Sequence, residues 1–206
     1  MRFRHFFHPH HGEVFLEYTK RLTSGSPDEV VFRANIISAK SPEPVGDVVV
    51  KFAPAYGIEG HKLLAERGLA PEVWYGEWEP VLGNFVVVMD FVPGNPCVEE
   101  LMSKQAASVH DAVALLHEHD LVFGDLRPGN LIAVAGEDRV VLIEFDWCGK
   151  VGEARYPRDI NFNDRIPWDH GVIGGGLIAK QHDMHLLATL PPRRNAPTAG
   201  YTARPM

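Results

Sequence analysis

The stretch LVFGDLRPGNLIAV, residues 121–134, decides how the rest of the chain is interpreted. Asp125 and Asn130 bracket the segment Leu-Arg-Pro-Gly, and apolar runs lie on both sides. Pro and Gly interrupt regular structure, so the stretch predicts a polar turn between two buried segments. The plainer interpretation is an Asx turn that serves only the backbone. The alternative is that Asp125, Arg127 and Asn130 are held together for chemistry.

The segments around this turn have clear periodicities. Before it, residues 103–120 predict a helix, since Val109, Ala112, Val113 and Leu116 fall on one helical face. After it, NLIAVA and RVVLIEF predict a small hairpin around a Gly-Glu-Asp turn. The chain is then irregular until a last helix over 177–190.

The first part of the chain is rich in β-formers. VVFRANII and DVVVKF, both between residues 13 and 52, predict strands. A helix is expected over 57–68, and two further strands over 70–80 and 84–92. A β-rich half followed by a helical half is the α+β pattern.

The motif FGDLRPGN resembles the catalytic loop of kinases, H-x-D-x-K/R-x-x-N, in the HGDLRPxN form of the aminoglycoside and choline kinase branch. It is especially similar to small kinase-like proteins common in fungi. The resemblance covers roughly residues 13–190 and implies a bilobal protein-kinase-like fold. It divides the chain into a flexible N-terminus (1–12), an N-lobe (13–92), a reduced C-lobe (93–190) and a disordered tail (191–206).

The resemblance implies a role for each residue of the turn. Phosphoryl transfer needs a carboxylate that orients the acceptor hydroxyl and takes its proton, and Asp125 would be that group. Arg127 would place a cation near the phosphoryl oxygens. Asn130 would offer a neutral oxygen to Mg²⁺. Phe123 stands where the family usually has His or Tyr.

The strand DVVVKF ends in Lys51, and a buried ammonium needs an anionic partner. In the family this lysine binds the α- and β-phosphates of ATP and pairs with a helix glutamate. Glu59 and Glu66 are the two candidates on the following helix. We expect Glu59, because Glu66 lies near the C-terminus, where a negative charge opposes the helix dipole.

The segment VVLIEFDWCG carries the expected metal ligands. Where the family reads IDF and uses its Asp on Mg²⁺, this chain has Glu144, with Asp146 two residues later. Glu extends about 1.5 Å further than Asp, so metal binding would be weakened, or carried partly by Asp146.

The ATP site would be completed by two further segments. Met89 would gate the adenine pocket, and Asp90, Phe91 and Val92 would form the hinge that bonds adenine through its backbone. Ser24–Ser26 would lie where kinases carry a glycine-rich loop. Asp183 in the last helix would brace the catalytic loop, as an acid does in relatives.

Composition limits the other functions. The 206 residues have a formal net charge of −7, with no dense Lys/Arg run, which argues against nucleic-acid binding. The two cysteines suggest free thiols in a reducing compartment. No apolar run is long enough to span a membrane, and no signal peptide is evident, so we expect an intracellular, cytoplasmic protein.

Two functions follow from the sequence. One is an ATP-dependent phosphotransferase that uses ATP and Mg²⁺ on a hydroxyl-bearing acceptor. The other is a pseudokinase that binds nucleotide or acts as a scaffold, favoured by Phe123, Glu144 and the short C-lobe. A separate hypothesis, metal binding by His5, His8, His10 and His11, ranks below a flexible terminus.

Overall fold

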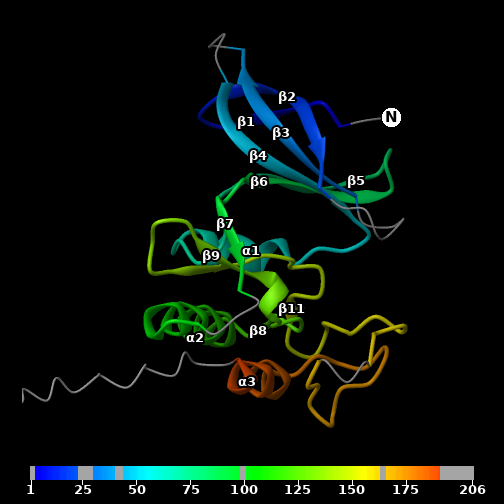
Figure 1. The fold of residues 1–206 in the computed structure, drawn as a ribbon. Helices are drawn as coiled ribbons and strands as arrows, with labels where there is room; N and C mark the ends of the chain where they lie inside the picture. Colours follow the sequence, from blue (N-terminus) through cyan, green and yellow to red (C-terminus); the bar gives the residue numbers. More distant parts are fainter. Residues whose placement is uncertain (1–2, 23–29, 40–43, 98–100, 163–165, 191–206) are drawn as a thin grey trace, which may run out of the picture.

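The computed structural model describes residues 3–22, 30–39, 44–97, 101–162 and 166–190. Its largest element is an antiparallel six-stranded sheet in the order β1-β2-β3-β4-β6-β5, at the top of Figure 1. The strands are β1 (His5–His8), β2 (Gly12–Arg21), β3 (Val30–Ser38), β4 (Pro44–Ala53), β5 (Val73–Glu79) and β6 (Asn84–Asp90). Except for β4 and β6, neighbours in the sheet are consecutive in the chain.

Strand β4 divides its side chains between two cores. Successive residues of a strand point to opposite faces. Val48 and Val50 therefore join a core cluster built from the sheet strands, while Val49 packs against the cluster that contains the helices. Lys51 follows on the same face as Val49 and is only 1% exposed. The alternation thus sends the lysine into the interior between sheet and helices.

The remaining elements lie below the sheet in Figure 1. They are α2 (Ser103–Glu118), α3 (Lys180–Thr189), the single-turn helix η1 (Pro128–Asn130) and the short strands β7 (Gly94–Pro96), β8 (Leu121–Val122), β9 (Leu131–Val134), β10 (Val140–Leu142) and β11 (Gly149–Lys150). Strands β9 and β10 form the predicted hairpin. The predicted apolar face of α2 is confirmed, since Val109, Ala112, Val113 and Leu116 are all buried.

Helix α1 (Ile58–Ala65) is shorter than the helix predicted over 57–68. Its rotation about its own axis is set by a close approach to Cys148. A methyl group added to Gly57 or Gly60 would overlap Cys148, so both positions require glycine. Because His61 lies on the same side of the helix, its ring is buried, and Glu59 is turned toward solvent.

The N-terminal segment differs from the prediction of a flexible residue range 1–12. Strand β1 pairs with β2, and Phe6 is 5% exposed while its neighbour Phe7 is 75% exposed. The period-two alternation of a half-buried strand therefore applies here. The predicted tail, 191–206, and the Ser24–Ser26 loop lie outside the described residues. Within the described ranges, no helix is long and apolar enough to cross a membrane.

Candidate active site

The polar turn between β8 and β9 brings its three functional side chains together. Asn130 Nδ2 donates hydrogen bonds of 2.8 Å to the backbone oxygen and to Oδ2 of Asp125. Arg127 Nη2 donates to the same Oδ2 at 2.6 Å. Arg127 Nε lies 2.5 Å from Asp125 Oδ1, yet neither of these buried atoms makes a hydrogen bond in the described structure. Burial raises the pKa of Asp125, and Arg127 and Asn130 oppose that rise.

Asp183 of α3 fixes the backbone just before Asp125. Its carboxylate accepts the N–H groups of Phe123 at 2.8 Å and Gly124 at 2.7 Å, and it lies 3.1 Å from His117 Nε2. The expected bracing by Asp183 is therefore confirmed. Phe123 is fully buried and packs edge-on against Phe145.

Lys51 pairs with both acids of the IEFDW segment. Its ammonium contacts Glu144 Oε2 and Asp146 Oδ2, which lie on the loop after β10. Burial alone would lower the pKa of Lys51, but the two carboxylates outweigh it and raise the pKa. Burial also raises the pKa of Asp146, an effect that Lys51 opposes and Glu144 reinforces. Two carboxylates face one ammonium, so the group carries an excess of negative charge at pH values above the pKa of Asp146, which is about 7.

The prediction that Glu59 pairs with Lys51 is wrong. Glu59 has a 64% exposed side chain and lies 3.8 Å from Lys150, at the surface. The residue that α1 turns inward is His61, whose ring bonds to the Tyr56 hydroxyl at 2.8 Å and to the Pro71 oxygen at 2.9 Å. Burial lowers the pKa of His61 to about 4, so this contact is neutral at ordinary pH.

Glu144 combines an acidic side chain with an unusual backbone. Its φ of 65° lies in the left-handed region, which non-glycine residues seldom adopt. Such strain is typical of functional positions where surrounding contacts hold the backbone. Within the described residues, no three His, Cys, Asp or Glu side chains are grouped to hold a metal. Glu144, Asp146 and Asn130 line one cavity, and carboxylate and amide oxygens are ligands that suit Mg²⁺.

The expected hinge follows the end of β6, next to β4. Met89 is 5% exposed and lies opposite Val49 in the sheet register. The N–H groups of Asp90 and Phe91 are already bonded to backbone oxygens of Glu72 and Asp47. The N–H of Val92 makes no such bond among the described residues.

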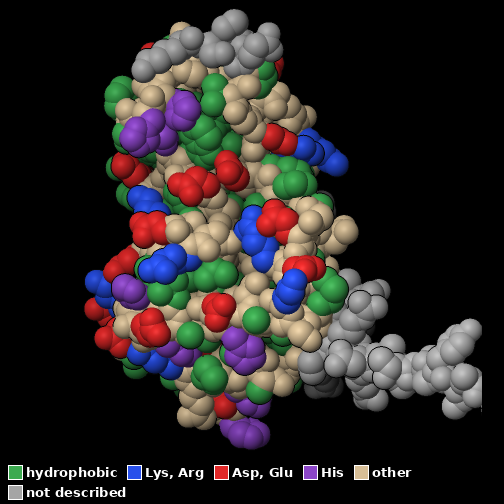
Figure 2. All heavy atoms as spheres, turned by 90° about the vertical axis from the view of Figure 1, so that its left-hand side faces the viewer, with side chains coloured by type: hydrophobic (Ala, Val, Ile, Leu, Met, Phe, Trp, Pro, Cys, Tyr) green, Lys and Arg blue, Asp and Glu red, His purple; other side chains and the backbone are tan. Residues whose placement is uncertain are grey.

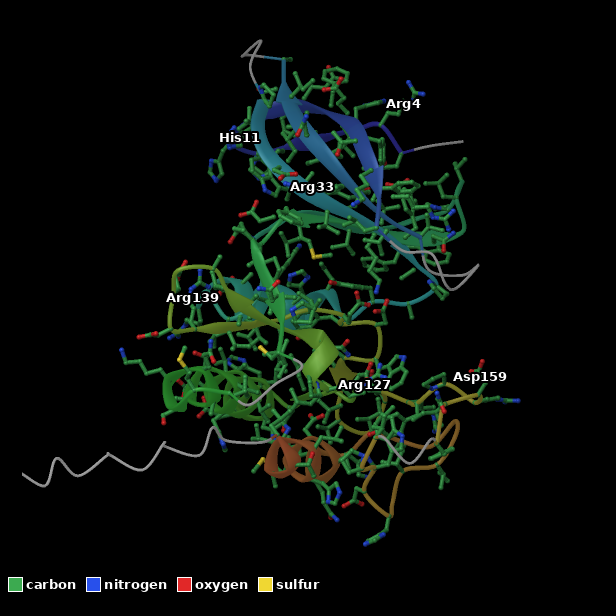
Figure 3. All side chains as sticks on the ribbon, viewed as in Figure 1. Arg4, His11, Arg33, Arg127, Arg139 and Asp159 are labelled. Atoms are coloured by element: carbon green, nitrogen blue, oxygen red, sulfur yellow. The ribbon has the colours of Figure 1, made fainter. Side chains whose placement is uncertain are left out.

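The catalytic turn and the acid pair share one small cavity of about 280 Å³. Its lining includes the predicted residues Asp125, Arg127, Asn130, Glu144 and Asp146. Figure 3 shows Arg127 beside η1, below the sheet. The structure thus brings together the predicted catalytic and metal-binding residues. Neither the inward position of His61 nor the aromatic cluster beyond Trp147 was predicted from the sequence. The helical spacing of His61 with Leu64 was the available signal for His61.

The His-rich segment belongs to the sheet, because it forms β1 and the turn into β2. The rings of His8 and His11 lie 5.0 Å from the indole of Trp74 and 5.0 Å from each other. On the face shown in Figure 2, Lys and Arg side chains are interspersed with Asp and Glu.

Comparison with known proteins identifies the fold. No family model matches the chain, and no curated protein matches it. A solved structure, that of the Cydia pomonella Granulovirus kinase, PK-1, is similar with a TM-score of 0.62. The likeness covers 85% of this chain and 68% of that chain at 15% sequence identity. The protein described here therefore has a kinase-like fold.

Proposed function

We propose that the chain is an ATP-dependent phosphotransferase that transfers the γ-phosphoryl group of ATP to a hydroxyl acceptor. The kinase-like fold supports the general class. The motif FGDLRPGN supports the aminoglycoside and choline kinase branch. In this proposal the six-stranded sheet and the part containing α2 and α3 act as the two lobes of a bilobal enzyme.

The observation that carries the proposal is the meeting of Asp125 with Glu144 and Asp146 in one cavity. In the transfer, the acceptor oxygen bonds to the γ-phosphorus, the bond from that phosphorus to the β–γ bridging oxygen breaks, and ADP leaves. Asp125 takes the acceptor proton on its carboxylate, whose Oδ1 lies 2.5 Å from Arg127 Nε and accepts no hydrogen bond in the described structure. Its raised pKa makes Asp125 a better base than an exposed carboxylate.

The remaining residues would bind the nucleotide. Lys51 would contact the phosphates, and the backbone N–H of Val92 would donate to adenine beside Met89. Glu144, Asp146 and Asn130 would hold Mg²⁺, and their excess negative charge favours a cation. When bound, Mg²⁺ would neutralise charge on the phosphates.

A second candidate is a pseudokinase that binds nucleotide without transfer. The specific observation in its favour is that Lys51 already pairs with both acids that would hold the metal. Phe123 supports it as well, since the ring cannot supply the hydrogen bond of the usual His or Tyr.

Thermal denaturation with ATP, with Mg²⁺ and with both ligands together tests the two candidate functions. It also shows whether the protein binds nucleotide at all. Ligands that bind the native state raise the Tm. If the chain is a phosphotransferase, the Tm should rise more with ATP and Mg²⁺ together than with ATP alone. ADP should also form when an acceptor is present. A shift without turnover over a broad acceptor panel supports the pseudokinase. No shift with any combination would remove both.

A further inference from the structure

A second cavity, of about 690 Å³, opens beside the catalytic turn. It shares Arg127, Asp146 and Trp147 with the smaller cavity that contains Asp125. Its opposite wall comes from described residues between β11 and α3, among them Arg155 and Trp168. A volume of this size is typical of small-molecule sites. The shared residues make it the space from which an acceptor would reach Asp125.

Aromatic rings form the apolar part of this cavity. The centroids of Trp147, Tyr156 and Trp168 lie 5.8 to 6.2 Å apart in all three pairs. The Tyr156 hydroxyl is bonded to His182 Nδ1 at 3.2 Å, and Trp168 Nε1 donates to the Asn161 oxygen at 2.9 Å. Tyr156 is 2% exposed, and its ring makes edge-on contacts with both indoles. The polar ends of Tyr156 and Trp168 are therefore used inside the protein, and flat apolar surface remains for a ligand.

The charged groups of the lining balance. Arg127 and Arg155 are the cations, and Asp146 and Asp159 are the anions. Arg127 is further paired with Asp125, and Asp146 with Lys51. In Figure 3, Asp159 lies out on the loop, on the same side of the molecule as Arg127. A site that selects a charged ligand carries an excess of the opposite charge, and the described residues of this lining carry none.

We infer that the acceptor is an uncharged hydroxyl compound with a flat aromatic body. Its ring lies against Trp147 and Trp168, and its hydroxyl points past Arg127 toward Asp125. This inference rests on the proposed function, because it names the substrate class of the same site.

Three phenols of nearly equal size test the charge selection. Tyrosol is neutral, tyramine carries a cation and para-hydroxyphenylacetate carries an anion. Each is titrated into the full chain without nucleotide, and binding is followed by calorimetry. Tyrosol should bind tightest, by about fivefold or more. Equal affinities, or tighter binding of either charged compound, would overturn the inference.

Charge variants make the test sharper. Arg155 and Asp159 are both exposed, so Arg155→Gln and Asp159→Asn should fold normally. Arg155→Gln leaves the lining with a net negative charge, so the affinity for tyramine should rise relative to the affinity for tyrosol. Asp159→Asn leaves the lining with a net positive charge, so the affinity for para-hydroxyphenylacetate should rise relative to the affinity for tyrosol. If neither variant changes the order of affinities, the lining does not select by charge and the inference fails.

The aromatic wall is tested with Trp168→Leu, which should weaken tyrosol binding about tenfold. Trp78→Leu is the matched control, since Trp78 is 49% exposed on β5 and outside the cavity. Equal affinity in both variants would contradict the inference. If Trp168→Leu does not fold, the charge variants still decide.

Transfer is measured separately, as phosphate moved from ATP-Mg²⁺ to tyrosol. Tyrosol binding without transfer to it or to any other alcohol would remove the proposed function and leave the binding site. Transfer to aliphatic alcohols without tyrosol binding would remove the inference and leave the proposed function.

Discussion

The imidazole of His61 lies flat against the ring of Phe145, with centroids 4.5 Å apart and planes inclined by 4°. A carbonyl oxygen only accepts hydrogen bonds, so the contact with Pro71 places the ring proton on Nε2. Nδ1 then accepts from the Tyr56 hydroxyl. Phe145 stands between the two acids that pair with Lys51, so a neutral stack joins α1 to the acidic segment.

This stack predicts a loss of stability in mild acid. The pKa of His61 is 6.5 in an unfolded chain and about 4 in the folded protein. Between these values the unfolded state binds more protons, so the free energy of unfolding falls as the pH is lowered. The loss should be roughly 2 kcal/mol between about pH 7.5 and about pH 5. Urea denaturation at the two pH values measures it.

The matched variants are His61→Gln and His170→Gln. His170 is exposed, so its replacement should keep the acid sensitivity of the wild type. His61→Gln should be less stable at neutral pH and lose part of that sensitivity. Identical pH dependence in both variants would show that His61 is not the responsible group.

Lys51→Met should weaken ATP binding, a loss of roughly 1–3 kcal/mol if the phosphates contact the ammonium. The same change leaves Glu144 and Asp146 without their cation. The nucleotide-free variant should therefore be less stable than the wild type. Mg²⁺ should raise the Tm of the variant by more than it raises the Tm of the wild type. Calorimetric titration and thermal denaturation check the two parts. Unchanged ATP affinity would leave Lys51 with a structural role only.

Asp125→Asn should abolish phosphoryl transfer and leave ATP affinity nearly unchanged. The amide keeps the shape of the carboxylate but cannot accept the acceptor proton. Rapid-quench assays measure transfer, and titration with ATP-Mg²⁺ measures binding. Full activity in this variant would exclude Asp125 as the base.

Glu144→Asp should shorten the carboxylate arm to the length that the kinase family uses. Mg²⁺ requires near-octahedral geometry at short distances, so activity with Mg²⁺ should rise. Asp also tolerates a positive φ better than Glu does, so the backbone at this position favours the change. The wild type should prefer Mn²⁺ over Mg²⁺ more strongly than the variant does. Loss of activity in Glu144→Asp would show that the longer carboxylate arm suits this site. If neither the wild type nor the variant turns over ATP with either metal, the pseudokinase is favoured.

The sequence predicted most elements of the fold because their side chains follow simple periods. The apolar face of α2 and the β9–β10 hairpin were recognisable from spacing and turn residues alone. Strand β1 was missed, although Phe6 and Phe7 alternate as in a half-buried strand. The surrounding histidines and the terminal position suggested flexibility, whereas pairing with β2 provides the order.

The candidate site was predictable only where the motif is local. Asp125 and Asn130 are close in the chain, so one turn decides their geometry. The partner of Lys51 depends on how α1 is rotated, and that rotation depends on contact of Gly57 and Gly60 with Cys148, far along the chain. No helical pattern contains that information. The choice of Glu59 failed for this reason.

The bridge from Lys51 to Glu144 joins residues 93 positions apart in the sequence. Closing so long a loop costs entropy that local hairpins do not pay, and contacts of this kind slow folding. The sheet hairpins and α2 can form before this contact does. The ion pair would then be absent from the folding transition state. Interactions that are absent from the transition state lower the unfolding rate. If the proposed nucleotide binds at this junction, it would slow unfolding and so lengthen the lifetime of the native state.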